Sequence, residues 1–388
     1  MTFHWITTPL EPILKDDPLF VLMALPNKLI GSKLQALVNY FFFVYMVILP
    51  VSCFLVIVAT NQWQIFYSPY SGYASGVFIV WSCYVSFFIF GSKYRRVYRD
   101  VFPHLWSLDV AGEEHHNRLK KIGKQLRTFK LVLITLAFIG ATSGLPWFGD
   151  DYDFYIPIKL IVDYCDQWKL FFSIFFYLSF YHIGVTVLSC FFSLMFLVLH
   201  LQNQFYLLKT RLQTFATDSG TSDVFLSMKV KDEEYNRSVT QEIVFCIRHH
   251  QSVLMYCDRL NDLLYLPIFY FTLSFIVTGV SVILFPKYDL QALIRSLFVI
   301  VLGMCMTLLF CSLGQLIENE SENVLYSLIE APWYLWNTTN RRLYYLFLLK
   351  AQDTVNLSSS GLITINFQLI LTLYRGIYSA LTFFLNFS

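Results

Sequence analysis

The sequence predicts an all-α, polytopic membrane protein with seven transmembrane helices. Of its 388 residues, 56% are hydrophobic and 14% are charged, whereas soluble proteins carry about 25% charged residues. Seven apolar segments are long enough to cross a bilayer, which takes roughly 20 helical residues. No polar stretch between them is long enough to fold as a separate soluble domain.

The expected spans are apolar runs bounded by polar or charged residues. Pro50 and Pro267 fall inside two of them, and membrane helices tolerate proline because neighbouring groups satisfy the freed backbone. Helical periodicity continues past the apolar part of the later spans, so we expect the fourth to seventh helices to project into the cytosol. The predicted limits are residues 36–60, 73–91, 129–148, 171–201, 263–285, 293–314 and 361–387.

The distribution of basic residues predicts the orientation. Twenty-three lysines and arginines fall in the N-terminal segment and in the connections after the second, fourth and sixth spans, against three on the opposite face. Under the positive-inside rule the N-terminus is therefore cytosolic and the C-terminus extracellular. This is the reverse of a G-protein-coupled receptor.

The last span reads GLITINFQLILTLYRGIYSALTFFLN and carries its polar residues at steps of three or four. On a helix of about 3.6 residues per turn, this spacing makes one continuous stripe. Two interpretations stay open: the stripe lines water, or it hydrogen-bonds to neighbouring helices in a packed bundle. Its arginine is a candidate functional residue, because a charge in a span is costly. The stripe consists of Thr364, Gln368, Thr372, Arg375, Ser379, Thr382 and Asn386.

Aromatic residues crowd the expected outer halves of the second, third and fourth spans. Ligand pockets are mostly apolar with a few polar groups and often lie between the helices of a bundle. These positions are therefore a candidate ligand site, with ordinary packing and interfacial aromatic residues as the alternative. The candidate residues are Tyr73, Val77, Val80, Trp81, Tyr84, Ser143, Gly144, Trp147, Phe176, Tyr177, Phe180 and Tyr181.

The outer connection 149–170 carries five aspartates. It is either an acidic lid that concentrates cations near an opening or an ordinary solvated loop. No motif of a catalytic, phosphate-binding or metal-dependent class occurs in the sequence. We therefore predict no enzymatic activity, no cofactor, no metal site and no nucleic-acid partner.

Two adjacent histidine pairs, His115–His116 and His249–His250, lie on the predicted cytosolic side. Neighbouring residues on a helix point about 100° apart, which is a poor arrangement for a metal site. We expect these histidines to be solvated.

The stretch from Cys311 to Gln352 resembles the C-terminal signature of the insect odorant receptor family. The final segment, SALTFFLNF, differs from the corresponding run of gustatory receptors, and the loop after the fourth span lacks the long insertion of the family's co-receptor. The resemblance therefore indicates an odour-tuned subunit. The matching residues are Cys311, Gly314, Gln315, Glu320, Ser321, Trp333, Tyr334, Arg341, Arg342, Gln352, Tyr378 and Ser379.

The resemblance implies a tetrameric, odorant-gated, non-selective cation channel that assembles with an odorant co-receptor. It implies that the last helix lines a central pore, with Ser379, Phe383 and Asn386 at the pore and gate. It also implies that a small volatile binds among the outer aromatic residues, and that the protein is a multi-pass component of the plasma membrane of olfactory sensory neurons.

On this interpretation the chain divides into three regions. Residues 1–314 form a six-helix ligand-binding transmembrane region with cytosolic loops, residues 315–360 a cytosolic helical anchor, and residues 361–388 the pore-lining helix. The alternatives are a seven-helix chemoreceptor that signals without its own pore, and a gustatory-type receptor channel.

Overall fold

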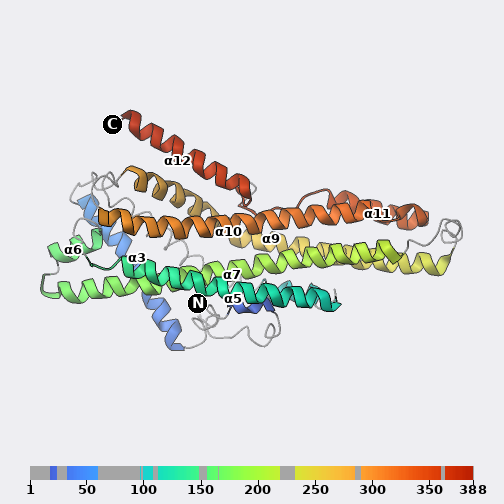
Figure 1. Ribbon diagram of the computed structural model, residues 1–388, viewed down its shortest axis with the longest axis horizontal. Helices are drawn as coiled ribbons and strands as arrows, with labels where there is room; N and C mark the ends of the chain where they lie inside the picture. Colours follow the sequence, from blue (N-terminus) through green and yellow to red (C-terminus); the bar gives the residue numbers. More distant parts are fainter. Residues whose placement is uncertain are drawn as a thin grey trace.

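The computed structural model describes residues 18–23, 33–59, 97, 99–107, 112–147, 155–164, 166–218, 232–284, 290–359 and 363–387. In this part of the chain, α5, α7, α9 and α10 run side by side along the long axis of an elongated bundle (Figure 1). The long helices are α3 (Lys33–Ala59), α5 (Gly112–Ser143), α7 (Lys169–Asp218), α9 (Glu233–Leu284), α10 (Leu290–Ile329) and α12 (Phe367–Phe387). Each contains most of one expected span, and the remaining expected span, 73–91, lies outside the described residues. The predicted all-α class is confirmed.

Shorter elements connect or cover these helices. The two β-strands pair with each other in antiparallel register, Ser358 opposite Thr364. The short elements are η2 (Pro18–Met23), η4 (Phe102–His104), α6 (Ile156–Tyr164), η6 (Asp166–Trp168), η8 (Trp333–Leu335), α11 (Thr338–Ala351), β1 (Ser358–Ser359) and β2 (Ile363–Thr364).

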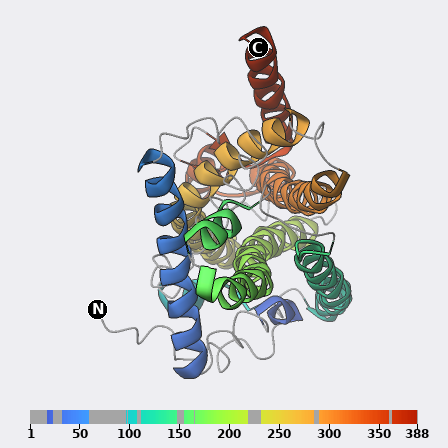
Figure 2. The same ribbon diagram turned by 90° about the vertical axis from the view of Figure 1, so that its left-hand side faces the viewer.

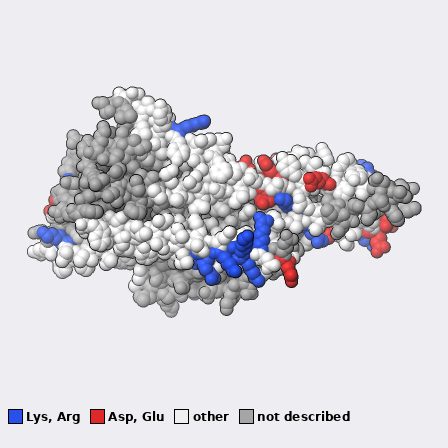
Figure 3. Space-filling model, in the orientation of Figure 1, with Lys and Arg blue, Asp and Glu red and all other residues white. Residues whose placement is uncertain are grey.

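Three of the helices are longer than a bilayer is thick. Helices α7, α9 and α10 contain 50, 52 and 40 residues, which corresponds to roughly 60–80 Å at 1.5 Å per residue, against a hydrocarbon core of about 30 Å. Charged side chains gather over the half of the molecule that holds α11 and the far ends of α7 and α9 (Figure 3). By length and composition, two stretches of the described residues qualify as membrane spans, His115–Ser143 and Lys169–Thr214.

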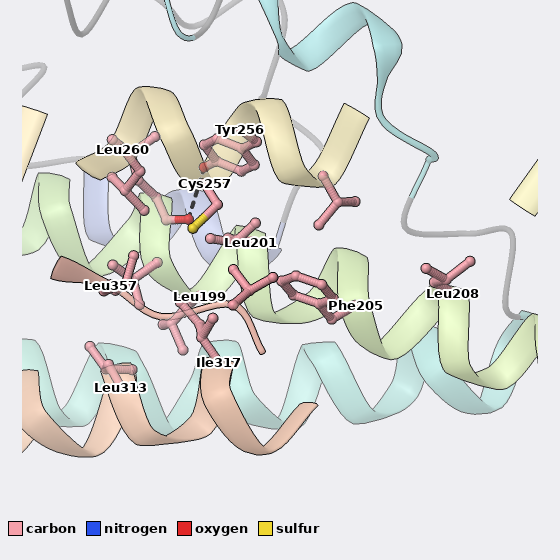
Figure 4. Close-up of a cluster of buried hydrophobic side chains, with 14 of the residues drawn as sticks. Leu199, Leu201, Phe205, Leu208, Tyr256, Cys257, Leu260, Leu313, Ile317 and Leu357 are labelled. Atoms are coloured by element: carbon pink, nitrogen blue, oxygen red, sulfur yellow. Dashed lines mark hydrogen bonds between the residues drawn. The ribbon is translucent and has the colours of Figure 1, made fainter. Parts of the chain in front are cut away.

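The main core lies where α7, α9 and α10 meet. Leu199 of α7, Tyr256 of α9 and Ile317 of α10 are buried together with Leu357, which precedes β1 (Figure 4). The Tyr256 hydroxyl donates a hydrogen bond to the carbonyl oxygen of Leu197 at 2.8 Å. A buried tyrosine hydroxyl needs such a partner, and here the bond joins α9 to α7.

The connection 149–170 is not simply a loop, because it contains α6 and η6. The segment IPIKLIVDY of α6 is mostly apolar, and Ile158 is buried. The helix is therefore stabilised by covering apolar surface of the bundle. The five aspartates of this connection hide this tendency in the sequence.

The last helix begins at Phe367, six residues later than expected. The preceding residues are held in an extended form, since the backbone N–H of Ile365 donates to the carbonyl of Leu357 at 2.8 Å. The side chain of Asn366 then accepts the N–H of Gln368 at 3.1 Å and satisfies one free donor at the helix start. Thr364 consequently lies in β2, and the helical part of the polar stripe starts at Gln368. Helix α10 runs without a break past residues 314 and 315.

The expectation of solvated histidine pairs is wrong for His115, His249 and His250, which are all buried. The ring of His249 stacks on Trp106 with centroids 3.8 Å apart, and its Nε2 lies 3.4 Å from the carbonyl oxygen of Gln204. Because the helix extensions pack against one another and against the segment around Trp106, positions that look polar in sequence become part of the core.

Burial lowers the pKa of both His249 and His250 to about 4. The positive charge of nearby Lys350 lowers the pKa of His250 further. Both side chains are therefore neutral in the folded protein at neutral pH. As the pH falls from about 6.5 towards 4, the unfolded chain binds protons that the folded chain does not, so stability is present above pH 6.5 and decreases on acidification.

Replacing His249 with Phe keeps an aromatic ring against Trp106 and removes one of these protonation sites. We expect the loss of thermal stability between pH 7 and pH 5 to be smaller in His249→Phe than in the wild type, as measured by the melting temperature of the purified protein in detergent. His104 is exposed, so His104→Phe is the matched control and should follow the wild-type pH profile. Identical pH profiles for all three proteins would contradict the conclusion that protonation of the buried His249 lowers the stability of the fold.

Candidate functional site

A compact aromatic cluster forms where α6 lies across the start of α7. Phe176 is 1% exposed and Tyr155 is 6% exposed, and their ring centroids lie 5.5 Å apart in an edge-on contact. Phe180 lies 5.0 Å from Phe176 and 5.6 Å from Tyr155, and Tyr177 packs against all three rings. Such edge-to-face pairs stabilise beyond their buried area by about 0.5–1.5 kcal/mol each. We call Tyr155, Phe176, Tyr177 and Phe180 the aromatic cluster.

Helix α5 joins the cluster through Gly144. A Cβ atom added at Gly144 would lie 3.0 Å from the ring of Phe180, a distance at which the ring has to shift. The Tyr155 hydroxyl donates a hydrogen bond to the Gly144 carbonyl oxygen at 3.2 Å. Because Gly144 has no side chain, the ring of Phe180 can occupy the space next to the end of α5. At Gly140, one turn earlier, an added Cβ would meet nothing within 4 Å.

Three other candidate residues lie apart from the aromatic cluster. Trp147 is 65% exposed and donates its indole N–H to the carbonyl of Thr142. Ser143 donates its hydroxyl to the backbone of its own helix, and Tyr181 contacts Phe138 with ring centroids 5.7 Å apart. The structure thus brings Gly144, Phe176, Tyr177 and Phe180 together and leaves these three outside the aromatic cluster, with Trp147 exposed. The remaining candidates, Tyr73, Val77, Val80, Trp81 and Tyr84, lie outside the described residues.

Tyr155 was not among the predicted site residues, although it holds the centre of the aromatic cluster. Tyr155 reaches this place because α6 is buried against the bundle. In the sequence, the only sign of that burial is the apolar run IPIKLIV, which follows an aspartate-rich stretch. His182 of α7 forms a contact between two helices. In the structure it stacks on Phe42 of α3 with centroids 3.9 Å apart.

Helix α12 has two different faces. Leu369, Leu373 and Ile377 follow one another at four-residue steps and are buried, and this ridge packs on α9 and α10. The helical members of the polar stripe all lie on the exposed part of the surface, centred roughly 140° around the helix from the ridge at 100° per residue. These exposed residues are Gln368, Thr372, Arg375, Ser379, Thr382 and Asn386.

Among the described residues, the exposed polar stripe makes no side-chain hydrogen bond to another helix. The hydroxyls of Thr372 and Thr382 donate to carbonyls of their own helix, those of Gln368 and Tyr378. Phe383 lies at the edge of the stripe and is 58% exposed. Figures 1 and 2 show the C-terminal part of α12 standing away from the other described helices. The interpretation of the stripe as glue between helices of its own bundle is therefore not supported by the described residues.

Two glycines hold α12 against α9. A Cβ atom added at Gly279 of α9 would lie 2.6 Å from Cδ1 of Ile377, and one added at Gly376 of α12 would lie 2.9 Å from Cδ1 of Ile276. Each helix thus receives an isoleucine of the other at a position without a side chain. The two helices are therefore packed too closely at these points for a side chain at either glycine.

The β-hairpin ties the start of α12 to two other helices. Asn261 of α9 accepts the backbone N–H of Ser358 at 2.9 Å and donates to the carbonyl of Asn356 at 3.2 Å. On the other side, Asn366 donates its side-chain amide to Glu318 of α10 at 3.4 Å. An added Cβ at Gly314 of α10 would overlap the carbonyl oxygen of Ile365. The backbone of α10 therefore touches the backbone that leads into α12.

The described residues contain no group of three or more His, Cys, Asp or Glu side chains that could hold a metal ion. The described cysteines Cys190, Cys246, Cys257, Cys305 and Cys311 are all free thiols.

Comparisons with known proteins identify one family. A model of the family described as 7tm odorant receptor matches residues 105–378. The solved structure of the insect olfactory receptor OR5 from Machilis hrabei aligns with a TM-score of 0.72 and 11% sequence identity, covering 96% of this chain and 97% of that chain. The same receptor in complex with eugenol aligns with a TM-score of 0.71, 11% identity and the same coverage. No curated protein matches the sequence.

Gly314→Ala tests the contact between α10 and the segment before α12. Alanine is favoured over glycine inside a helix by about 1 kcal/mol, but here the new methyl group meets a backbone carbonyl. We expect Gly314→Ala to lower the melting temperature of the purified protein by several degrees. Gly303 lies in the same helix and an added Cβ there meets nothing within 4 Å, so Gly303→Ala should keep or raise it. Equal behaviour of the two variants would show that the contact does not constrain the fold.

Proposed function

The chain belongs to the 7tm odorant receptor family, and from that premise we propose that it is the odour-tuned subunit of a ligand-gated, non-selective cation channel. In this proposal a small volatile binds in the outer transmembrane region. Binding opens a central pore lined by α12, and the chain acts in a heterotetramer with an odorant co-receptor.

The observation that carries the proposal is the exposed polar stripe of α12. Polar side chains at membrane depth need water or protein partners, since lipid offers none. The buried ridge of Leu369, Leu373 and Ile377 faces its own chain, so the stripe faces away from it. Several copies of such a helix, arranged around an axis, would enclose a water-filled path. Phe383 would form the hydrophobic constriction, with Ser379 and Asn386 on either side of it along the path.

The aromatic cluster supports the ligand part of the proposal. Eugenol, which is bound in one of the similar structures, is a small aromatic volatile, and Phe176, Tyr177 and Phe180 offer rings for such a molecule. In the structure, Phe180 fills the space beside Gly144. A ligand would have to displace a ring there or bind beside it, with Ser143, Trp147 and Tyr181 and the second-helix candidates Tyr73, Val77, Val80, Trp81 and Tyr84 completing the site.

Helix α7 offers a route from the ligand to the pore. It carries Phe176 and Phe180 near its start and packs on α9 and α10 further along. Those two helices hold α12 through the paired glycines and the β-hairpin. A ligand that binds the open arrangement better than the closed one shifts the equilibrium towards the open state, and α12 is the element that moves.

The proposed orientation has a cytosolic N-terminus and an extracellular C-terminus in the plasma membrane of an olfactory sensory neuron. The gathering of charge over one half of the molecule supports it (Figure 3), because long polar helix extensions belong in water. We propose residues 315–360 as the cytosolic anchor and residues 361–388 as the pore region.

A second candidate is a seven-helix chemoreceptor that signals without its own pore. In that case the polar stripe of α12 would bind another protein. The gustatory-type alternative is less favoured, because the family model that matches is the odorant receptor one.

Whole-cell current separates these candidates. Cells expressing this chain with an odorant co-receptor, and dialysed with a G-protein blocker, should give an odour-evoked cation current that the chain without its co-receptor does not give. Phe383→Ala should raise the current without odorant several-fold, because a smaller side chain widens and wets the constriction. Currents are compared at equal surface expression.

Tyr374→Ala is the matched control for Phe383→Ala. Tyr374 is similarly exposed on α12, at 49%, and points to the opposite side of the helix at 100° per residue, so its removal should leave the basal current unchanged. A current abolished by the blocker, or equal basal currents in both variants and the wild type, would favour signalling without a pore.

A further inference from the structure

Helix α5 carries a row of basic side chains with no partner among the described residues. Lys120, Lys121, Lys124 and Arg127 are all exposed, and none lies within 4.0 Å of a described carboxylate. At 100° per residue, all four fall within about 120° of the helix circumference. Figure 3 shows lysine and arginine side chains gathered over α5 as a blue patch. We call these four residues the basic face of α5.

Three other basic residues on the same half of the molecule are paired with a carboxylate. Lys209 lies 3.8 Å from Glu320, Arg211 pairs with Glu242, and Lys350 lies 2.9 Å from Asp353. An exposed lysine alone is ordinary, but four adjacent cations without carboxylates repel one another. Such a face is stabilised by an anionic partner.

The same face of α5 becomes apolar one turn further on. Leu131 and Val132 are 57% and 51% exposed, and Phe138 and Ile139 follow on the same side. The opposite side of the helix is buried against the bundle at Leu133. A helix face that is basic and then continuously apolar crosses from the headgroup layer into the hydrocarbon of a bilayer.

Helix geometry places the basic face at the headgroups. At 1.5 Å per residue, Arg127 and Lys124 lie about 6 and 10 Å along the axis from Leu131, and the headgroup layer on each side of the hydrocarbon is roughly 7 Å thick. Lys120 and Lys121 lie about 5 Å further, roughly 8–10 Å beyond the headgroup layer. This is about one screening length at physiological salt, so they act on the headgroups more weakly than Lys124 and Arg127. All four charges therefore act on lipid headgroups of one leaflet.

We propose that the basic face of α5 is a binding site for anionic phospholipids of the cytosolic leaflet. Juxtamembrane lysines and arginines attract acidic lipids, each with about a five-fold gain in binding. Lipid is favoured over a protein partner because the basic face continues directly into the lipid-exposed apolar face. The inference takes the membrane orientation from the proposed function but does not depend on channel activity, so lipid binding and channel activity can fail independently.

The test is a titration of the purified full-length protein, in neutral detergent, with fluorescent phosphatidylserine and with fluorescent phosphatidylcholine. We expect the wild type to bind phosphatidylserine at least ten-fold more tightly than phosphatidylcholine. The variant K120Q/K121Q/K124Q/R127Q should lose at least about 20-fold of that affinity, and raising the salt concentration should weaken only the binding of phosphatidylserine.

Two control variants separate the effect of this site from the effects of substitution and of net charge. K120R/K121R/K124R/R127K keeps the charge and should bind phosphatidylserine within about three-fold of the wild type. The variant R237Q/R248Q/R259Q/R342Q removes the same number of exposed charges elsewhere and should also stay within about three-fold of the wild type. If the four-glutamine variant of α5 proves unstable, K124Q/R127Q replaces it, with an expected loss of about five-fold or more.

Three results would overturn the proposal. The first is wild-type affinity for phosphatidylserine in the neutralised α5 variants. The second is an equal loss of affinity in R237Q/R248Q/R259Q/R342Q, which would show that only the net charge of the protein matters. The third is displacement of phosphatidylserine by inorganic phosphate at millimolar concentration, which would identify a site for free anions instead of lipid.

Discussion

The packing of α12 against its own chain is the constraint on which the rest of the structure depends. Leu369, Leu373 and Ile377 fix one side of this helix on α9 and α10, so the polar stripe has to face away from the bundle. A membrane helix cannot leave such a stripe in lipid. Nothing among the described residues covers this surface, and in the proposed channel the stripe faces water or neighbouring subunits.

The same helix is held by backbone contacts that leave it little freedom at its start. Gly314 touches the carbonyl of Ile365, Asn261 holds β1, and the glycines Gly279 and Gly376 each accept an isoleucine of the facing helix. Away from these contacts, the C-terminal part of α12 stands clear of the described bundle (Figure 2). A helix that is anchored at its start and extends away from the bundle can follow a movement of the helices that hold it.

Periodicity in the sequence predicted the parts of this arrangement that are local. The helices at six of the seven expected spans, the all-α class and the stripe from Gln368 onward follow from apolar run length and from steps of three and four residues. The sequence did not reveal that Thr364 belongs to a β-hairpin, that Tyr155 lies at the centre of the aromatic cluster, or that His249 is buried against Trp106. The hairpin is held by Asn261 of α9, Tyr155 by the rings of α7 and His249 by Trp106. In each case tertiary packing decided the outcome, and the local residue pattern does not show it.

Cysteine accessibility along α12 tests the central claim most directly. Thr372→Cys and Ser379→Cys lie on the polar stripe, whereas Tyr374→Cys is also exposed in the single chain but lies about 120° around the helix from the centre of the stripe. In cells that express the chain with an odorant co-receptor, a water-soluble cationic thiol reagent should block the odour-evoked current of the first two variants only. Block at Tyr374→Cys with none at Thr372→Cys and Ser379→Cys would contradict the account.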